Sequence, residues 1–336
     1  MLRAARGGRA SGHTAAALLA LMSAAAAPAA SQSAPGGDPV VCRVGVNVED
    51  LYDFDPTRET FGAVLWLWSL CPSADPAPLE TMSFRTAMPG LQLGEVHSTR
   101  VDEGGLYQYR RVQGTFRHDW DMSRYPLDRH RLVIPFDESD LGAEVVIFEA
   151  DIDSSALAPE LRSRLDGWEV SDLELRASVA EEPSDYGWPG AESVGYARLE
   201  AVVDLQRTAR LLAFIKPTFG VFAAALIAFL AFFLDPREKG TFGSKLGLLV
   251  GVLFAVLLNL RATDALIGDA TRLTLVTAVH LVVLVLIVVI ALLALREQRR
   301  VEREMPVRYP DRPLLAVTAG LYLLINLGLV ARAAWG

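Results

Sequence analysis

The sequence predicts an α+β membrane protein, in which an exported β-sandwich domain precedes a four-helix transmembrane bundle. Three observations support this fold class. Residues 1–30 read as a secretory signal, residues 31–210 show short alternating apolar segments separated by turns, and four long apolar segments follow within residues 211–336. A chain of 336 residues that is 51% hydrophobic is long enough for one soluble core beside such a bundle.

The first thirty residues have the three parts of a signal peptide. Arg3, Arg6 and Arg9 form a basic start, residues 15–27 an apolar run, and residues 27–30 (Ala-Pro-Ala-Ala) a small-residue cleavage site. A fifth membrane anchor is the alternative, but the run is short and rich in alanine. We expect this segment to direct export.

The segment 31–210 is acidic, with 32 Asp and Glu against 16 Arg and no Lys. This charge disfavours nucleic acid as a partner. The five histidines lack metal-ligand spacing, and neither a nucleophile motif nor a glycine-rich phosphate loop occurs. We therefore expect no enzyme, no cofactor and no metal site.

Two strands open this domain. Residues 44–48 alternate between valine and other residues, residues 61–68 form a second strand, and the Asp- and Pro-rich segment 53–60 is a turn. If that turn is centred on residues 56–57, Cys42 and Cys71 face each other.

These two residues are the only cysteines. Facing cysteines can form a disulfide in an oxidising compartment. A slip of one residue would instead leave two buried thiols on opposite faces.

Further strands and turns alternate over residues 105–136, which is typical of a β-sandwich. Within this stretch, Tyr125-Pro-Leu-Asp128 predicts a rigid turn.

Four helices are expected at about 211–234, 244–261, 273–296 and 313–334. The second has only fifteen uncharged residues, fewer than the ~20 that a lipid-exposed span needs, so we expect its neighbours to shield it. Residues 235–245 and 296–312 are rich in Arg and Lys and should face the cytoplasm. The N-terminal domain and the C-terminus are then periplasmic, at a bacterial inner membrane.

The ordered set of motifs resembles a known family. The motifs that precede or open the helices are Phe116, Asp121, Tyr125-Pro-Leu-Asp128, Gly167-Trp-Glu-Val170 and Ile215-Lys-Pro217. Their order resembles that of the pentameric ligand-gated ion channels of the prokaryotic branch, which lack the Cys-loop bridge. The resemblance implies a homopentamer in membrane lipid, a ten-strand sandwich, a small-molecule or proton agonist at subunit interfaces, and a pore for a permeant ion lined by the second helix.

The resemblance also implies a ligand site containing Tyr107, Asp137, Glu138, Tyr186 and Trp188. Aromatic rings with carboxylates suit an amine through cation–π attraction. Trp66 and Trp68 lie on the strand that supplies the opposite wall, although strand aromatics more often serve packing.

The resemblance further implies that the domains are coupled through loops at the membrane face, here with the residues Asp55, Tyr125, Pro126, Asp128, Arg207, Arg210 and Asp264. Asp55, Asp128 and Arg210 are charged groups that we expect to exchange partners between closed and open states. The alternative is that they are ordinary solvated surface charges.

Aligned with the family, the second helix points Lys245, Gly247, Gly251, Phe254, Leu258 and Arg261 at the pore axis. A shift by one residue would present Leu246, Val250, Leu253, Leu257 and Leu260 instead. In the first register, we expect Phe254 to be the hydrophobic gate. The positive charges of Lys245 and Arg261 would then favour the passage of anions over cations. For the two glycines, close helix packing is the alternative.

His280 lies within the third helix. An ionisable group inside a membrane is a candidate for function, here proton sensing. An interhelical hydrogen bond explains it equally well. Together these features predict a ligand-gated ion channel subunit, with a non-conducting, ligand-binding receptor as the alternative.

Overall fold

The structure is a computed structural model that describes residues 38–101, 104–184, 194–267 and 273–335. The expected signal segment and two expected ligand-site residues, Tyr186 and Trp188, lie outside the described residues. The strands are β1 (Val40–Asp55), β2 (Thr60–Cys71), β3 (Gln92–Leu93), β4 (His97–Arg100), β5 (Leu106–Arg117), β6 (Arg129–Gly142), β7 (Val146–Ala150), β8 (Ala156–Leu157), β9 (Trp168–Glu182) and β10 (Val194–Arg207). Three short helical turns connect them: α1 (Pro78–Thr81), η2 (Met122–Arg124) and α2 (Leu161–Arg164).

These strands form two sheets, as a sandwich requires. The larger has the order β3-β5-β2-β1-β7, with β4 paired to β5 and β8 paired to β1, and the smaller has the order β6-β10-β9. Long antiparallel pairings dominate both sheets, and β7 and β8 run parallel to β1. The predicted β-domain is therefore confirmed.

The β1–β2 hairpin follows the register expected from a turn centred on residues 56–57. Arg43 pairs with Leu70 and Val48 with Leu65, and two bulges nearer the turn then shift the pairing. This register places Cys42 beside Cys71, and the two form a disulfide with an S–S distance of 2.04 Å.

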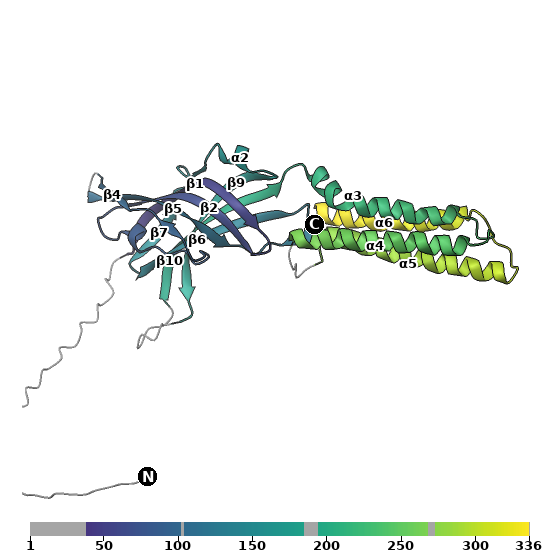
Figure 1. The fold of residues 1–336 in the computed structure, drawn as a ribbon. Helices are drawn as coiled ribbons and strands as arrows, with labels where there is room; N and C mark the ends of the chain where they lie inside the picture. Colours follow the sequence, from purple (N-terminus) through teal and green to yellow (C-terminus); the bar gives the residue numbers. More distant parts are fainter. Residues whose placement is uncertain (1–37, 102–103, 185–193, 268–272, 336) are drawn as a thin grey trace, which may run out of the picture. The chain divides into compact units, whose positions relative to one another are not determined.

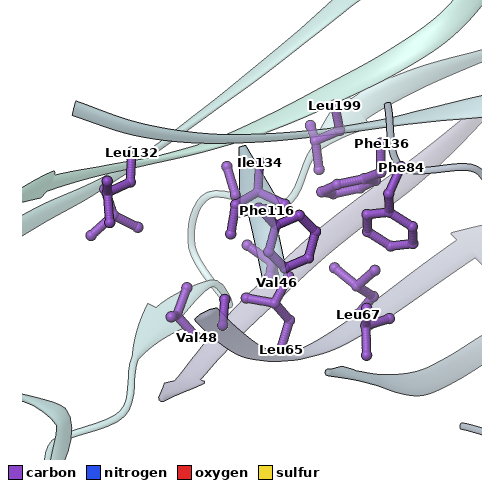
Figure 2. Packing of buried hydrophobic residues seen from close by; sticks show 14 of the residues in the cluster. Val46, Val48, Leu65, Leu67, Phe84, Phe116, Leu132, Ile134, Phe136 and Leu199 are labelled. Atoms are coloured by element: carbon purple, nitrogen blue, oxygen red, sulfur yellow. The ribbon is translucent and has the colours of Figure 1, made fainter. Parts of the chain in front are cut away.

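The core of the β-domain is built from alternate residues of facing strands. Figure 2 shows Val46 and Val48 of β1 with Leu65 and Leu67 of β2 packed toward β6 and β10, together with Phe116, Leu132, Ile134, Phe136 and Leu199. All of these are fully buried. Burying a Leu, Ile or Phe side chain stabilises the fold by roughly 1.5–3 kcal/mol, so this alternation holds the two sheets together.

Four helices follow the β-domain, and all are long and apolar enough to cross a membrane. They are α3 (Arg210–Phe229), which continues into η3 (Leu230–Phe233), α4 (Thr241–Ile267), α5 (Leu275–Glu302) and α6 (Arg312–Trp335). The α4 helix is longer than its fifteen uncharged residues suggested, so Lys245 and Arg261 lie inside it. Its C-terminal turns continue because residues 262–267 contain neither proline nor glycine.

Candidate functional site

Asp128, at the end of the predicted turn, is the centre of a buried ionic cluster. Its Oδ1 accepts a hydrogen bond from Nε of Arg207 at 2.8 Å, and its Oδ2 lies 2.7 Å from Nε2 of His130. Arg207 is held between two aromatic faces, 4.1 Å from Trp168 and 4.9 Å from Tyr125. The Asp128 side chain is fully buried, so it is not an ordinary solvated charge.

The protonation state of Asp128 follows from these partners. Burial alone would raise the pKa of its carboxyl, but the hydrogen bond from His130 and the charge and hydrogen bond of Arg207 outweigh burial and lower that pKa. Because the ionised carboxylate only accepts, Nε2 of His130 carries the proton that they share.

A second histidine lies behind this cluster. His118 contacts Trp120 and His130 edge-on, with ring centroids 4.8 Å and 5.8 Å apart. Its Nε2 is buried without a hydrogen-bond partner in the described part of the chain. Burial, and secondarily the charge of His130, lower the pKa of His118 to about 4, so this ring is neutral near pH 7.

The other expected coupling residues lie apart from this ionic cluster. Asp55 accepts hydrogen bonds from the amides of Thr57 and Arg58 within its own turn. Arg210 donates to Gln206, and Asp264 lies exposed near the end of α4. Pro126 follows Tyr125 in the same turn as Asp128. The cluster thus unites Tyr125, Asp128 and Arg207, and Arg207 is three residues before the start of α3.

The expected ligand residues Asp137 and Glu138 belong to β6, which continues to Gly142 instead of ending before them. Asp137 is 2% exposed and pairs with two guanidinium groups. Nε and Nη2 of Arg198 donate to it at 2.6 and 2.7 Å, and Nε of Arg85 donates at 2.5 Å. These hydrogen bonds raise the pKa of both arginines. Asp137, which was expected to meet a ligand amine, is therefore paired with two arginines within the chain.

Glu138 is fully buried and has different partners. Its Oε1 accepts from the amides of Asp140 and Leu141 at 2.9 and 3.1 Å, and its Oε2 accepts from Thr81 Oγ1 at 2.6 Å. No arginine or lysine pairs with it among the described residues.

A hollow of about 500 Å³ opens beside these carboxylates. It is lined by Ser83, Arg85, Glu138, Ser139 and Tyr196. Arg85 also pairs with Glu182 of β9. The hollow is thus formed by β6, β10 and the segment after α1, and it has the size of a small-molecule site.

The expected aromatic residues of the ligand site lie in the other sheet. Tyr107 is on β5, 6.0 Å from Tyr109, and does not line the hollow. Trp68 donates from Nε1 to Asp151 at 2.9 Å, and Trp66 lies 6.2 Å from Tyr109. Both tryptophans are half-buried on the outer face of the sheet.

The α4 helix has two unlike faces. Lys245, Leu249, Val252, Val256 and Thr263 are buried, with Leu249, Val252 and Val256 inside the apolar core shared with α3 and α5. Gly247 follows Lys245 by two residues, a rotation of about 200° on a helix of 3.6 residues per turn. The opposite face therefore carries five residues that were expected in the pore, all exposed: Gly247, Gly251, Phe254, Leu258 and Arg261.

Exposure is greatest along this stripe. Phe254 is 61% and Leu258 71% exposed. In the alternative register, Leu246, Val250 and Leu257 are 37%, 49% and 39% exposed, and Leu253 and Leu260 are half-buried. A Cβ added to Gly247 or Gly251 would meet nothing within 4 Å. The two glycines consequently do not serve helix packing within the described chain.

Lys245 does not share this face. Its side chain is 4% exposed, and Nζ donates to Oε2 of Glu297 on α5 at 2.6 Å. Lys245 was expected to line the pore, and in this structure its ion pair turns it toward α5. Of the two cations expected to make the pore axis positive, Lys245 and Arg261, only Arg261 lies on the exposed face of α4.

His280 joins two helices. Its Nε2 lies 2.7 Å from Oδ1 of Asn259 on α4, and its Nδ1 lies 2.8 Å from the carbonyl oxygen of Val276 one turn earlier. The interhelical hydrogen bond, one of the two explanations considered for this residue, is present.

Sequence reasoning missed several members of these sites. Trp168 was noted only as part of a motif, and Arg85, Arg198 and His130 were not considered as partners of Asp137 and Asp128. His130 lies only two positions from Asp128, a spacing that the sequence itself shows. Arg85 and Arg198 lie 52 and 61 positions from Asp137, so only the fold brings them to it. Their residue type, arginine near buried aspartate, was the one available signal.

Neither a protein-family model nor a curated protein matches this sequence.

Proposed function

We propose that this chain is a subunit of a ligand-gated ion channel in which five copies surround a pore lined by α4. The proposal rests on the resemblance described above and is supported most by one observation. The α4 helix packs one face against α3 and α5, while its opposite face, from Gly247 to Arg261, has no partner in the part of the chain that the structure describes.

An exposed stripe that combines glycine, Phe254 and Leu258 suits the lining of a narrow, dewettable pore. Subunits that meet head to tail around a five-fold axis would bring five such stripes together. Phe254 is the bulkiest residue of the stripe and would form the constriction.

The remaining parts have roles in the same mechanism. Agonist binding to the β-domain, on the periplasmic side of the inner membrane, shifts the closed–open equilibrium by its different affinity for the two states. The Asp128–Arg207 cluster lies at the C-terminal end of β10, directly before α3, and would transmit movement of the sheet to the helices. The Cys42–Cys71 disulfide fits an exported domain.

Ion flux tests this proposal directly. Purified protein reconstituted in liposomes should conduct, and Phe254→Ala should raise the conductance because it removes the largest side chain of the stripe. Leu321→Ala on α6 is the matched control, since Leu321 is 59% exposed but lies on another helix. It should leave the conductance unchanged.

A non-conducting receptor remains the second candidate, because the stripe is almost entirely apolar. Pentamers that bind ligand but pass no ion, in the wild-type protein and in Phe254→Ala alike, would favour that receptor over the channel.

A further inference from the structure

Lys216 is a cation within the first candidate membrane span. It lies six residues after the start of α3, about 9 Å along the helix axis at 1.5 Å per residue. The residue is exposed, and its ammonium has no hydrogen-bond or ion-pair partner in the described chain. Because a charge within a membrane is costly unless it is paired or reaches water, this ammonium needs a counterion.

Asp264 is an acid in the same situation. It is exposed in the last turn of α4, and its carboxylate has no hydrogen-bond or ion-pair partner among the described residues. The four candidate spans contain two further acids, Glu297 and Glu302. Glu297 pairs with Lys245 at the other end of α4, and Glu302 follows it by five residues. Asp264 is therefore the acid of these spans that is free to neutralise Lys216.

The two charges lie at the same level of the bundle but on opposite sides of α4. Lys216 lines a hollow of about 590 Å³ together with Ala262 and Thr263, close to the C-terminal end of α4. Asp264 follows Ala262 by two residues, a rotation of about 200° on a helix of 3.6 residues per turn. The carboxylate therefore points away from the hollow, and within one chain α4 separates the two charges.

Repetition of the chain around an axis brings these two sides of α4 together. Asp264 ends an exposed edge of α4 that includes Val250 and Leu257 at seven-residue spacing, 49% and 39% exposed. This edge borders the stripe that begins at Gly247, on the side away from the hollow. In a ring whose stripes face a common axis, the edge of one copy meets the α3 side of the next, because the contact is head to tail.

We propose that Lys216 of one copy forms an ion pair with Asp264 of the neighbouring copy, which places the edge of α4 over the hollow. The inference rests on the proposed channel ring and names a charged contact between its subunits. A closed ring forms as many pairs as it has copies and leaves no charge over. An open dimer would leave one ammonium and one carboxylate without a partner.

Carbodiimide cross-linking of the purified full-length protein in liposomes tests this contact. The reagent activates a carboxylate, and an ammonium in direct contact then forms an amide bond with it while the reagent leaves as a urea. The chain contains three lysines, Lys216, Lys239 and Lys245. The wild type should give covalent dimers and larger multimers on a denaturing gel. Mass spectrometry of their peptides should show residue 216 joined to residue 264.

Conservative variants identify the two cross-linked groups. Lys216→Arg and Asp264→Asn should each abolish the joined peptide and the multimers. Lys216→Arg keeps the charge, whereas its guanidinium forms no amide with this reagent, so an intact pentamer that no longer cross-links supports the pair. Lys239→Arg is the matched control, because Lys239 lies between η3 and α4. It should give the same multimers as the wild type.

Exchange of the two charges tests whether the pair contributes to assembly. Asp264→Lys places two ammonium groups in contact and should lower the fraction of pentamer in native mass spectra. Adding Lys216→Asp to this variant should restore the pentamer. Arg332→Glu is the control, because Arg332 is an exposed cation on α6 and lies outside the proposed contact. It should leave the pentamer fraction unchanged.

The outcomes separate this contact from the channel itself. A conducting pentamer that yields no peptide joining 216 to 264 overturns the ion pair and leaves the channel intact. The pair is equally overturned if that peptide occurs only in the monomer band. The joined peptide in multimers without ion flux would support the contact and contradict the channel, and a monomeric wild type would contradict both.

Discussion

At the scale of single residues, Asp128 is a buried acid of the β-domain, as Asp137 and Glu138 are. It holds Arg207 and His130 at hydrogen-bond distance with no exposed side-chain surface. Removing one partner of a buried ion pair costs about 3–5 kcal/mol, because the other charge is left unpaired. An exposed pair contributes only about 0–1 kcal/mol.

We therefore expect Asp128→Asn to destabilise the β-domain by about 3–5 kcal/mol in urea unfolding followed by tryptophan fluorescence. Asp204→Asn is the control, because Asp204 pairs with Arg131 at 3.0 Å with both side chains about half exposed. It should cost less than about 1 kcal/mol. Equal effects of the two substitutions would contradict the structural role of Asp128.

His118 predicts a pH dependence of stability. Its pKa is lowered from 6.5 to about 4 in the folded state, so the unfolded chain takes up a proton first as the pH falls. Stability should then be constant above pH 6.5 and fall by roughly 3 kcal/mol between pH 6.5 and 4.

His118→Phe removes this group and should flatten the stability profile in that interval, as measured by urea unfolding at each pH. His97→Gln serves as the control, because His97 is exposed on β4 and stacks on Tyr109. If His118→Phe keeps the wild-type slope, another group is responsible for the loss of stability.

At the scale of elements, α4 combines two periodic faces in one helix. Its buried face follows the i, i+4, i+7 spacing of Lys245, Leu249 and Val252, and the exposed stripe runs half a turn away. The Lys245–Glu297 ion pair fixes the rotation of α4 against α5 near the start of the helix. This rotation decides which residues the proposed pore receives.

Cysteine substitution tests that rotation. Single cysteines at positions 251, 254 and 258 should react with a water-soluble thiol reagent, because a water-filled pore lets the thiol ionise. Cysteines at 249, 252 and 256 should stay unreactive, since these side chains are buried. The two native cysteines are joined in a disulfide and do not interfere.

A cysteine at Leu324 of α6 distinguishes a pore from a lipid surface. Leu324 is 69% exposed, and we expect lipid around it, where the reagent does not dissolve. Reaction at 324 but not at 254 would mean that the stripe of α4 faces lipid.

At the scale of the whole molecule, the proposed pore and ligand site each need neighbouring subunits to complete them. The hollow beside β6 and the stripe on α4 both lie on surfaces that no other part of the described chain covers. In a ring, neighbouring subunits would cover both at once. A head-to-tail contact closes into a ring of definite number.

Native mass spectrometry of the detergent-solubilised protein should consequently give five times the mass of the mature chain. A monomer or dimer at all protein concentrations would leave the α4 stripe without a partner and would rule out the pore. The same spectrum reports cleavage of the expected signal segment.

The sequence by itself determined the fold class, the β1–β2 register and the order of four helices long and apolar enough to cross a membrane. These features follow from local periodicity, turn residues and apolar length, which adjacent residues encode. Even the pairing of Cys42 with Cys71 required only the centre of one turn. For the exposed face of α4, helical spacing left two registers open, and the family resemblance favoured the one from Gly247 to Leu258.

Only the tertiary structure decided which charges are already paired. Asp137 meets Arg85 and Arg198, Lys245 meets Glu297, and Asp128 meets Arg207, through contacts between segments 52 or more positions apart. A buried charge pairs with whichever countercharge the fold brings near, and the spacing of residues in the sequence does not show which one that is. For this reason the family resemblance suggested an amine site at Asp137 and a pore lysine at 245, whereas each of these side chains pairs with an opposite charge in the structure.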